Sequence, residues 1–237
     1  MTDPVPLRRG PPPPLAIPVV APKSVAIVAM GKSCDQYIYE ATNMGGRHAV
    51  ADETWAIGNQ GGVIQCDRVF TMNDFDAAHK KATELKIENV HESFKWLKTC
   101  PVPVYCSKAH PDYPSTVDYP LEEVLQILKF PYLNGSVAYA IGFAFLIGVE
   151  RLRLFGCDYT YPDNHVAEKG RACVEFWLMR WLLEGKKLDL PHGTSLLDNN
   201  VPNGQKFYGY TDDVRAEIVD GETRIVRQPR DRPDAAA

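Results

Sequence analysis

At 237 residues the chain is long enough to bury one full hydrophobic core. Hydrophobic residues make up 45% of it and charged residues 24%, which is typical of a globular protein and excludes a disordered or fibrous one. The formal net charge of −4 provides no overall attraction to nucleic acid or to an anionic membrane.

The cysteines and the apolar runs indicate the compartment. The six cysteines lie singly, without a C-x-x-C pair, which favours free thiols in a reducing compartment over a disulfide framework or a zinc site. The first residues are proline-rich rather than apolar, unlike a secretory signal. The longest apolar run, Val137 to Val149, is too short to cross a bilayer. We therefore expect a cytoplasmic protein without a membrane span.

Residues 1–22 contain eight prolines, which favour an extended polyproline II segment. We expect a flexible tail there, with a docking motif for a proline-binding partner as the alternative. Residues 23–210 are predicted to form one Rossmann-like nucleotide-binding transferase domain. Residues 211–237 are predicted to form a hairpin and a flexible C-terminal tail.

The stretch from Ser24 to Cys34 predicts a buried strand, a tight turn and the start of a helix. Its first seven residues include five that are Val, Ala or Ile, as in a strand of a parallel sheet. Gly31-Lys32-Ser33 follows as a turn, and a helix is expected from Cys34 to Met44. Because helix N-termini attract anions, we hypothesise that this turn holds the phosphate end of a nucleotide. An ordinary strand-to-helix turn is the alternative.

Further strands alternate with helices along the chain. Strands are expected at residues 53–58, 68–72, 101–106 and 151–155, and helices at residues 77–85, 94–98, 121–128, 137–147 and 167–184. Residues 107–120 form a loop long enough to act as a lid. The alternation predicts parallel pairing with right-handed crossovers. The predicted fold class is α/β, with a Rossmann-like, mostly parallel sheet flanked by helices.

The C-terminal third supplies three further expectations. The aromatic residues of the last long helix, Phe176, Trp177 and Trp181, have the spacing of a core-facing stripe. Strands at residues 215–219 and 222–226 flank Asp220-Gly221, which is a strong β-hairpin signal. The residues from Gln228 onward are expected to be a disordered tail.

Four short segments carry a family resemblance. They are Met30-Gly31-Lys32-Ser33, Gly58-Asn59-Gln60, Asn134-Gly135-Ser136 and Leu154-Phe155-Gly156-Cys157-Asp158-Tyr159. Their succession resembles the Rossmann-like bacterial sialyltransferases that use CMP-sialic acid. It is also similar to a related family that includes the 6-hydroxymethylpterin diphosphokinases. The resemblance covers roughly Val25 to His192.

The resemblance implies a set of site residues. The implied nucleotide contacts are Gly31, Ser33 and Asn59, and Ser136, Gly156 and Asp158 would line the same crevice. Lys32, Asn134 and Gly135, which belong to the same segments, are further candidate contacts. Tyr159 and Tyr161 are the implied partners of the leaving phosphate. His192 is the nearest match to the family's base, with His165 second. Histidine titrates near neutral pH and therefore suits that role.

The first turn departs from the family's Gly-Asn-Gly-Pro-Ser pattern, because Met30 and Lys32 replace the asparagine and the proline. Lys32 would pair with a diphosphate or triphosphate, or is simply a solvated turn residue. Asp74 and Asp158 follow different strands, where they would hold Mg²⁺ between phosphates. Capping of a turn by Asp158 is the alternative.

Three functional hypotheses follow. The first is a glycosyltransferase that uses a nucleotide-activated sugar, of the CMP type, and an acceptor that is a saccharide, a metabolite or a modified nucleic-acid base. The second is a diphosphokinase-like transferase that uses ATP and Mg²⁺. The third is a non-catalytic nucleotide-binding or assembly protein. The oligomeric state is left open. No H-E-x-x-H, P-loop or nucleophile-elbow pattern occurs, which disfavours those enzyme classes.

Overall fold

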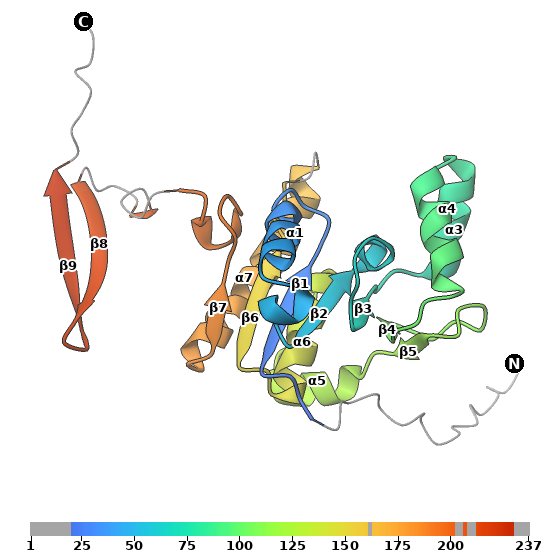
Figure 1. The fold of residues 1–237 in the computed structure, drawn as a ribbon, viewed down its shortest axis with the longest axis horizontal. Coiled ribbons are helices and arrows are strands. Elements are labelled where there is room, and N and C mark those ends of the chain that lie inside the picture. Colours follow the sequence, from blue (N-terminus) through green and yellow to red (C-terminus); the bar gives the residue numbers. More distant parts are fainter. Residues whose placement is uncertain (1–19, 161–162, 202–205, 208–211, 230–237) are drawn as a thin grey trace, which may run out of the picture.

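Seven strands form a parallel sheet in the order β5-β4-β3-β2-β1-β6-β7 (Figure 1), in a computed structural model that describes residues 20–160, 163–201, 206–207 and 212–229. The strands are β1 (Ser24–Val28), β2 (Glu53–Ile57), β3 (Arg68–Phe70), β4 (Val104–Cys106), β5 (Thr116–Asp118), β6 (Arg151–Phe155) and β7 (Lys187–Asp189). All six neighbouring pairs are parallel. The predicted α/β class with a mostly parallel sheet is confirmed.

Strand β1 lies in the middle of the sheet, between β2 and β6. Its residues Val25, Ala26, Ile27 and Val28 have no exposed surface. A strand buried on both faces needs a continuous apolar run rather than alternation, which is the pattern its sequence has. From β1 the chain builds outward through β2 to β5 on one side, and then crosses to β6 and β7 on the other.

Helices cover both faces of the sheet. They are α1 (Cys34–Asn43), α2 (Arg47–Val50), α3 (Phe75–Glu84), α4 (Glu88–Leu97), α5 (Leu121–Leu128), α6 (Ser136–Ile147) and α7 (Asn164–Leu183). One face packs against α5, α6 and α7 through Val25, Ile27 and Trp55. The other packs against α1 and α2 through Ala26 and Val28, and against α3 and α4 through further residues of β2, β3 and β4.

The stripe predicted on α7 is core only in part. Trp177 and Trp181 are fully buried, as expected, and Phe145 of α6 packs edge-on against Trp181 at 4.9 Å between ring centroids. Phe176 is 44% exposed and contacts Phe130 instead, with ring centroids 5.5 Å apart. Helical spacing predicts which residues share a face of α7, but packing against neighbouring elements determines how much of each side chain is buried.

Several element predictions need correction. Residues 107–120 are not a free loop, because they contain strand β5, which pairs with β4 just before this segment. Strand β7 had not been predicted, and α4 begins at Glu88 rather than near Phe94. The edge strands β5 and β7 have three residues each. Such a short strand shows no periodicity and forms only because a neighbouring strand supplies its hydrogen bonds.

The C-terminal hairpin consists of β8 (Asp212–Val219) and β9 (Glu222–Pro229), which are antiparallel and pair only with each other in the described residues. Asp220 and Gly221 both have positive φ, at 54° and 80°, as expected for an Asp-Gly hairpin turn. The predicted hairpin is confirmed, but it is longer than expected. Gln228 pairs with Asp213, so the predicted tail begins too early.

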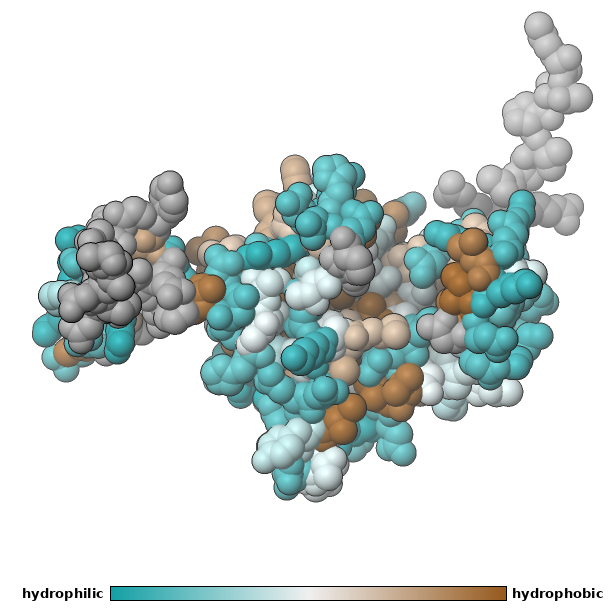
Figure 2. Space-filling model, turned by 90° about the horizontal axis from the view of Figure 1, so that it is seen from above, coloured by the Kyte–Doolittle hydropathy of each residue, from teal (hydrophilic) through white to brown (hydrophobic). Residues whose placement is uncertain are grey.

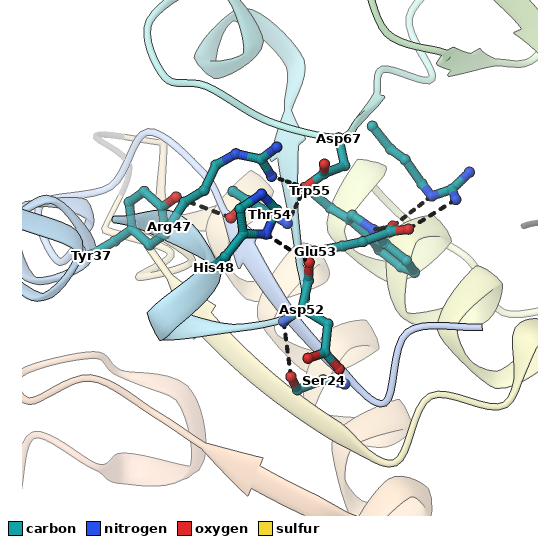
Figure 3. A network of polar contacts seen from close by, with 10 residues as sticks. Ser24, Tyr37, Arg47, His48, Asp52, Glu53, Thr54, Trp55 and Asp67 are labelled. Carbon is teal, nitrogen blue, oxygen red and sulfur yellow. Dashed lines mark hydrogen bonds and ion pairs between the residues drawn. The ribbon is translucent and has the colours of Figure 1, made fainter. Parts of the chain in front are cut away.

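A polar network ties β1 and β2 together at the edge of the sheet where both strands begin (Figure 3). The carboxylate of Asp52 accepts hydrogen bonds from the N–H groups of Lys23, at 2.9 Å, and Ser24, at 2.8 Å. The carboxylate of Asp67 accepts one from Thr54 N–H, at 2.8 Å, and one from the guanidinium of Arg47. These contacts are structural, and they lie opposite the carboxyl edge of the sheet. None of the described helices has both the length and the apolar character needed to span a membrane.

Candidate functional site

A cleft of about 490 Å³ lies at the carboxyl edge of the sheet. It is formed by the segments that follow β1, β2, β3 and β6, together with the first turns of α6 and α7. The residues that line it are Ala29, Met30, Ile57, Gly58, Asn59, Asn73, Asn134, Gly135, Ser136, Val137, Gly156, Cys157, Tyr159, Val166, Lys169 and Gly170.

The position of the cleft follows from the strand order. Successive connections leave β1 toward β2 on one side, whereas β6 lies on its other side. The loops after β1 and β6 therefore diverge, and open parallel sheets bind ligands in the crevice that this divergence leaves. Met30 and Gly156, which follow those two strands, both line the cleft.

The turn after β1 is closed by a carboxylate of the protein itself. Asp158 accepts hydrogen bonds from Ser33 N–H, at 2.7 Å, and from Ser33 Oγ, at 2.5 Å. Ser33 Oγ in turn accepts one from Gly156 N–H, at 2.8 Å. Ser33 and Asp158 are 6% and 4% exposed. The anion at the start of α1 is thus the carboxylate of Asp158.

Gly31 is required by the same closure. A Cβ atom at this position would lie 2.6 Å from the Gly156 carbonyl oxygen and 2.8 Å from Asp158 Oδ2. Partial burial raises the pKa of the Cys34 thiol, and the carboxylates of Asp35 and Asp158 raise it further. Lys32 is exposed, and the cleft-lining residues include none from this turn beyond Met30. The structure gives Gly31 and Ser33 a structural role, and the predicted phosphate contacts of this turn stay a prediction.

The start of α6 lies in the lining of the cleft and has no side-chain cap. Gly135 precedes the helix with φ of +96° and has no side chain to cap it. Gly135, Ser136 and Val137 all line the cleft. Ser136 Oγ accepts a hydrogen bond from Met72 N–H, at 3.1 Å, which anchors this end of the helix to the segment after β3. The first N–H groups of a long helix, together with its dipole, suit a phosphate.

Lys169 is the one charged side chain among the described residues that line the cleft. It comes from α7, on the side of the cleft formed by Val166 and Gly170. An ammonium group without a neighbouring carboxylate in the lining favours an anionic ligand. The sequence interpretation missed Lys169, because a lysine among the charged residues of a helix usually faces solvent.

Two asparagines add hydrogen-bonding groups. Asn59, predicted as a nucleotide contact, lies in the cleft, and its Oδ1 accepts from Ser93 Oγ at 2.8 Å. Asn73 also lines the cleft, whereas the predicted Asp74 does not. Asp74 caps α3 instead, since its Oδ1 accepts from Ala77 N–H at 2.9 Å. Asn73 therefore lines the cleft, and the next residue, Asp74, caps the helix.

The two predicted Mg²⁺ ligands both accept hydrogen bonds from the protein itself. The carboxylate of Asp158 is committed to Ser33, and that of Asp74 to the first turn of α3. In the described part of the chain, no three His, Cys, Asp or Glu side chains come together as metal ligands would. Asp158 caps a turn, which is the alternative raised by its sequence position.

The aromatic and histidine candidates divide between the cleft and the surface. Tyr159 lines the cleft with φ of +52°, and its ring lies against Gly170, where a Cβ atom would be 2.5 Å from Tyr159 Cε1. His165 is exposed in the first turn of α7, one residue before the cleft-lining Val166. Tyr161 lies outside the described residues.

His192 lies against α1 rather than in the lining of the cleft. Its backbone N–H donates to Gln36 Oε1 at 3.1 Å, and its carbonyl oxygen accepts from Gln36 Nε2 at 2.7 Å. Both hydrogen bonds use the backbone of His192, and the residue is exposed. This pair of hydrogen bonds positions the loop, and no local pattern in the sequence predicts a contact between residues 156 positions apart.

Comparison with known proteins gives a limited result. No family model and no curated protein matches the sequence. Among solved structures, the chain is similar to the sialyltransferase CstII from Campylobacter jejuni in complex with cytidine-5′-monophosphate, at 15% identity and a TM-score of 0.45 over 75% of this chain and 83% of that one. The complex of CstII with CMP-3FNeuAc matches at 14% identity and a TM-score of 0.41, over 71% and 79% of the two chains.

Proposed function

We propose that this chain is a glycosyltransferase that uses a nucleotide-activated sugar of the CMP type as its donor. The observation that carries the proposal is the set of residues that line the cleft at the carboxyl edge of the sheet. It combines the uncapped start of α6 with the ammonium group of Lys169, and none of its described lining residues carries a carboxylate. This combination suits a ligand that brings one phosphate and no metal ion.

The phosphate of the donor is placed at the start of α6, where the backbone N–H groups near Ser136 would donate to its oxygens. Lys169 would face the same phosphate from α7. Asn59 and Asn73 would bond the hydroxyl or base groups of the nucleoside. A CMP-sugar carries a single phosphate between nucleoside and sugar, and its modest charge is matched by one cation and one helix end.

In the proposed reaction an acceptor hydroxyl oxygen forms a bond to the anomeric carbon of the donor sugar. The bond between that carbon and the phosphate oxygen breaks, and its electron pair leaves with the nucleoside monophosphate. The start of α6, Lys169 and the hydroxyl of Tyr159 stabilise the charge that develops on this oxygen. The acceptor proton passes to the imidazole of His165, which lies one helical turn before Lys169 on the same face of α7.

The ATP-dependent alternative is less well supported. Transfer of a diphosphoryl group needs Mg²⁺ bridging the phosphates, and Mg²⁺ needs carboxylate oxygens. The two carboxylates expected to supply them, Asp74 and Asp158, hold a helix cap and a turn. A non-catalytic nucleotide-binding protein is the third outcome, and activity measurements separate it from the first.

A thermal-shift panel of CMP, UDP, GDP and ATP, each with and without Mg²⁺, tests the donor assignment. A bound ligand raises the unfolding temperature by mass action. We expect CMP to give the largest shift and Mg²⁺ to leave it unchanged. A shift with ATP that requires Mg²⁺ would support the diphosphokinase alternative, and the absence of any shift would overturn nucleotide binding.

The cleft assignment is tested with Lys169→Met, which keeps the length of the side chain and removes its charge. We expect CMP to bind at least about tenfold more weakly, the scale of one charge-assisted contact. Lys80→Met on the exposed face of α3 is the matched control and should bind CMP as the wild type does. Equal effects of the two substitutions would place the nucleotide elsewhere.

A further inference from the structure

The hairpin of β8 and β9 has a long sheet edge to which no other described strand is paired. Each of its strands has eight residues, and the two pair only with each other among the described residues. A hairpin of two strands is marginally stable in water, and independent stability takes at least three strands or packing against a helix. A further strand at one of its edges would therefore stabilise the hairpin.

The turn of the hairpin determines which backbone groups of β8 point away from β9. It has two residues with positive φ, so the flanking residues Val219 and Glu222 exchange both of their backbone hydrogen bonds. Every second residue of β8 before Val219 pairs with β9 in the same way. The N–H and C=O groups of the residues between them, which include Val214 and Ala216, therefore point outward. Such a row of donors and acceptors is a template for pairing with another strand.

The side chains of β8 alternate between an apolar face and a charged face. Val214 and Ala216 share one face, on which Ala216 lies opposite Ile225 of β9. Arg215 and Glu217 share the other face, and both are exposed. Figure 2 shows the hairpin at the left of the molecule, with hydrophilic residues along its outer side. The two charges on β8 have opposite signs and lie two residues apart, so this edge can complement a copy of itself.

The register that brings the charges together is an antiparallel pair of two β8 strands with a two-fold axis at Ala216. Residues equally distant from Ala216 then lie opposite each other. Arg215 lies opposite Glu217 of the partner subunit, and Glu217 lies opposite Arg215 of the partner subunit. Opposite charges at such cross-strand positions stabilise the pairing. Both ion pairs fall at non-hydrogen-bonded positions, where facing side chains are closest, because the outward backbone groups belong to Val214 and Ala216.

The sheet of the same chain gives the hairpin no edge of matching length among the described strands. Its edge strands, β5 and β7, have three residues each, whereas β8 has eight. Figure 1 draws the hairpin well away from both of them. A second β8 strand, by contrast, matches the first one in length and in the placing of its charges.

We propose that β8 is a dimerisation edge, at which two copies of this chain join their hairpins into one antiparallel sheet with the strand order β9-β8-β8-β9. The contact is isologous, because the same strand of both copies forms it, and it therefore closes at two copies. It also gives each hairpin the additional strands that it lacks alone. The inference concerns a surface outside the cleft and does not depend on the proposed donor.

Sedimentation equilibrium of the full chain tests the inference, and we expect a reversible equilibrium between monomer and dimer. Arg215→Glu places like charges opposite each other at both ion pairs and should weaken the dimer at least about tenfold. Lys80→Glu, at an exposed position of α3, changes the net charge equally and should dimerise as the wild type does. A wild-type chain that stays monomeric up to about 1 mM, the range of weak association, would overturn the inference. Equal dissociation constants for Arg215→Glu and the wild type would also overturn it.

Mixing two variants tests the register of the contact. The second variant combines Glu217→Arg with Arg224→Glu, which keeps opposite charges at these two cross-strand partners within one hairpin. Alone it places like charges opposite each other, as Arg215→Glu does, and should dimerise as weakly. An equal mixture of the two variants restores both ion pairs and should form a heterodimer with an affinity within about threefold of the wild-type dimer. A mixture that associates no better than either variant alone would overturn the inference.

Discussion

Asp158 is the residue whose surroundings most change the interpretation of the site. It is buried, and its side-chain oxygens accept hydrogen bonds from the hydroxyl and the N–H of Ser33. A buried carboxylate is tolerated when donors of this kind surround it. These hydrogen bonds therefore connect the turn after β1 to the segment after β6, and both segments contribute residues to the cleft.

Ser33→Ala tests this structural role. Removing the hydroxyl leaves the buried carboxylate of Asp158 with one donor fewer and Gly156 N–H without its acceptor. We expect the free energy of unfolding, measured with urea, to fall by about 2 kcal/mol. The affinity for CMP, corrected for the folded fraction, should stay within about threefold of the wild type, a difference of less than about 1 kcal/mol. A large loss of CMP affinity with unchanged stability would restore the turn as a phosphate site.

His165 and His192 are the two histidines that the sequence offers as a general base. His165 is in the helix that contributes Lys169 to the cleft, whereas His192 is fixed against Gln36 through its backbone. We expect His165→Ala to lower turnover at least about a hundredfold, the scale of a lost general base, and to leave CMP affinity unchanged. His192→Ala serves as the control and should keep its turnover. The reverse pattern in kcat would assign the base to His192.

A mostly buried ion pair between Arg68 and Glu53 links β2 to β3. Arg68 donates to Glu53 through Nε, at 2.8 Å, and through Nη2, at 3.1 Å, and Trp55 Nε1 donates to the same carboxylate at 2.7 Å. The side chains of Arg68 and Glu53 are 8% and 18% exposed. Figure 3 shows Glu53 and Trp55 side by side in this network.

Glu53→Ala should therefore be strongly destabilising. The guanidinium of Arg68 would stay buried without its carboxylate, for which we expect a loss of about 3 kcal/mol in the free energy of unfolding. Glu122→Ala on the exposed first turn of α5 is the control and should change it by less than about 0.5 kcal/mol. Urea denaturation followed by tryptophan fluorescence measures both. A loss under about 1 kcal/mol for Glu53→Ala would mean that solvent reaches Arg68 after the substitution.

The start of β1 makes stability depend on acid pH. The pKa of Asp52 lies below its ordinary value. The hydrogen bond from Ser24 N–H is the largest cause, and the hydrogen bonds from Ser24 Oγ and Lys23 N–H add to it. A lowered pKa in the folded state means that the contribution of Asp52 is complete above about pH 4 and is lost as the pH falls through the folded pKa. Asp52 is exposed, so the contribution stays below about 1 kcal/mol.

Urea denaturation of Asp52→Asn at a series of pH values between 5 and about 3 checks this expectation. The wild type should be the more stable protein at pH 5, and the difference should shrink as the pH falls. Glu84→Gln, at an exposed position of α3, controls for the loss of a surface charge. A difference that does not change over this range would contradict a lowered pKa for Asp52.

At the scale of the whole molecule, the hairpin of β8 and β9 is separate from the sheet. Its strands pair only with each other among the described residues, and Figure 1 draws the hairpin well away from the seven-stranded sheet. An isolated two-stranded hairpin is marginally stable, so it contributes little to the stability of the rest.

Ending the chain after residue 201 should therefore leave the main unfolding transition in place. We expect the midpoint in calorimetry to change by less than about 3 °C, which corresponds to less than about 1 kcal/mol for a domain of this size. The CMP-induced shift should also be retained. A drop of more than about 8 °C would show that the hairpin belongs to the folded unit, and would contradict the predicted division near residue 210.

The sequence by itself determined the class of the fold and the edge where the cleft lies. Apolar runs such as Val25 to Val28, alternating with helices, are sufficient to predict a parallel sheet, because a strand buried on both faces must be apolar throughout. The residues after those strands then meet at one edge. The family resemblance added Asn59, Gly135 and Gly156 as candidate residues of the crevice, and all three line the cleft.

Packing between distant parts of the chain determines what each helix start contacts. The start of α1 and the start of α6 are similar in sequence terms, since each follows a glycine-containing turn. The difference is that Asp158, distant in the chain, folds back onto Ser33. The same kind of long-range packing brought Lys169 into the cleft. Local periodicity contains no information about contacts between such distant residues, so the site's charge was set by the folded chain alone.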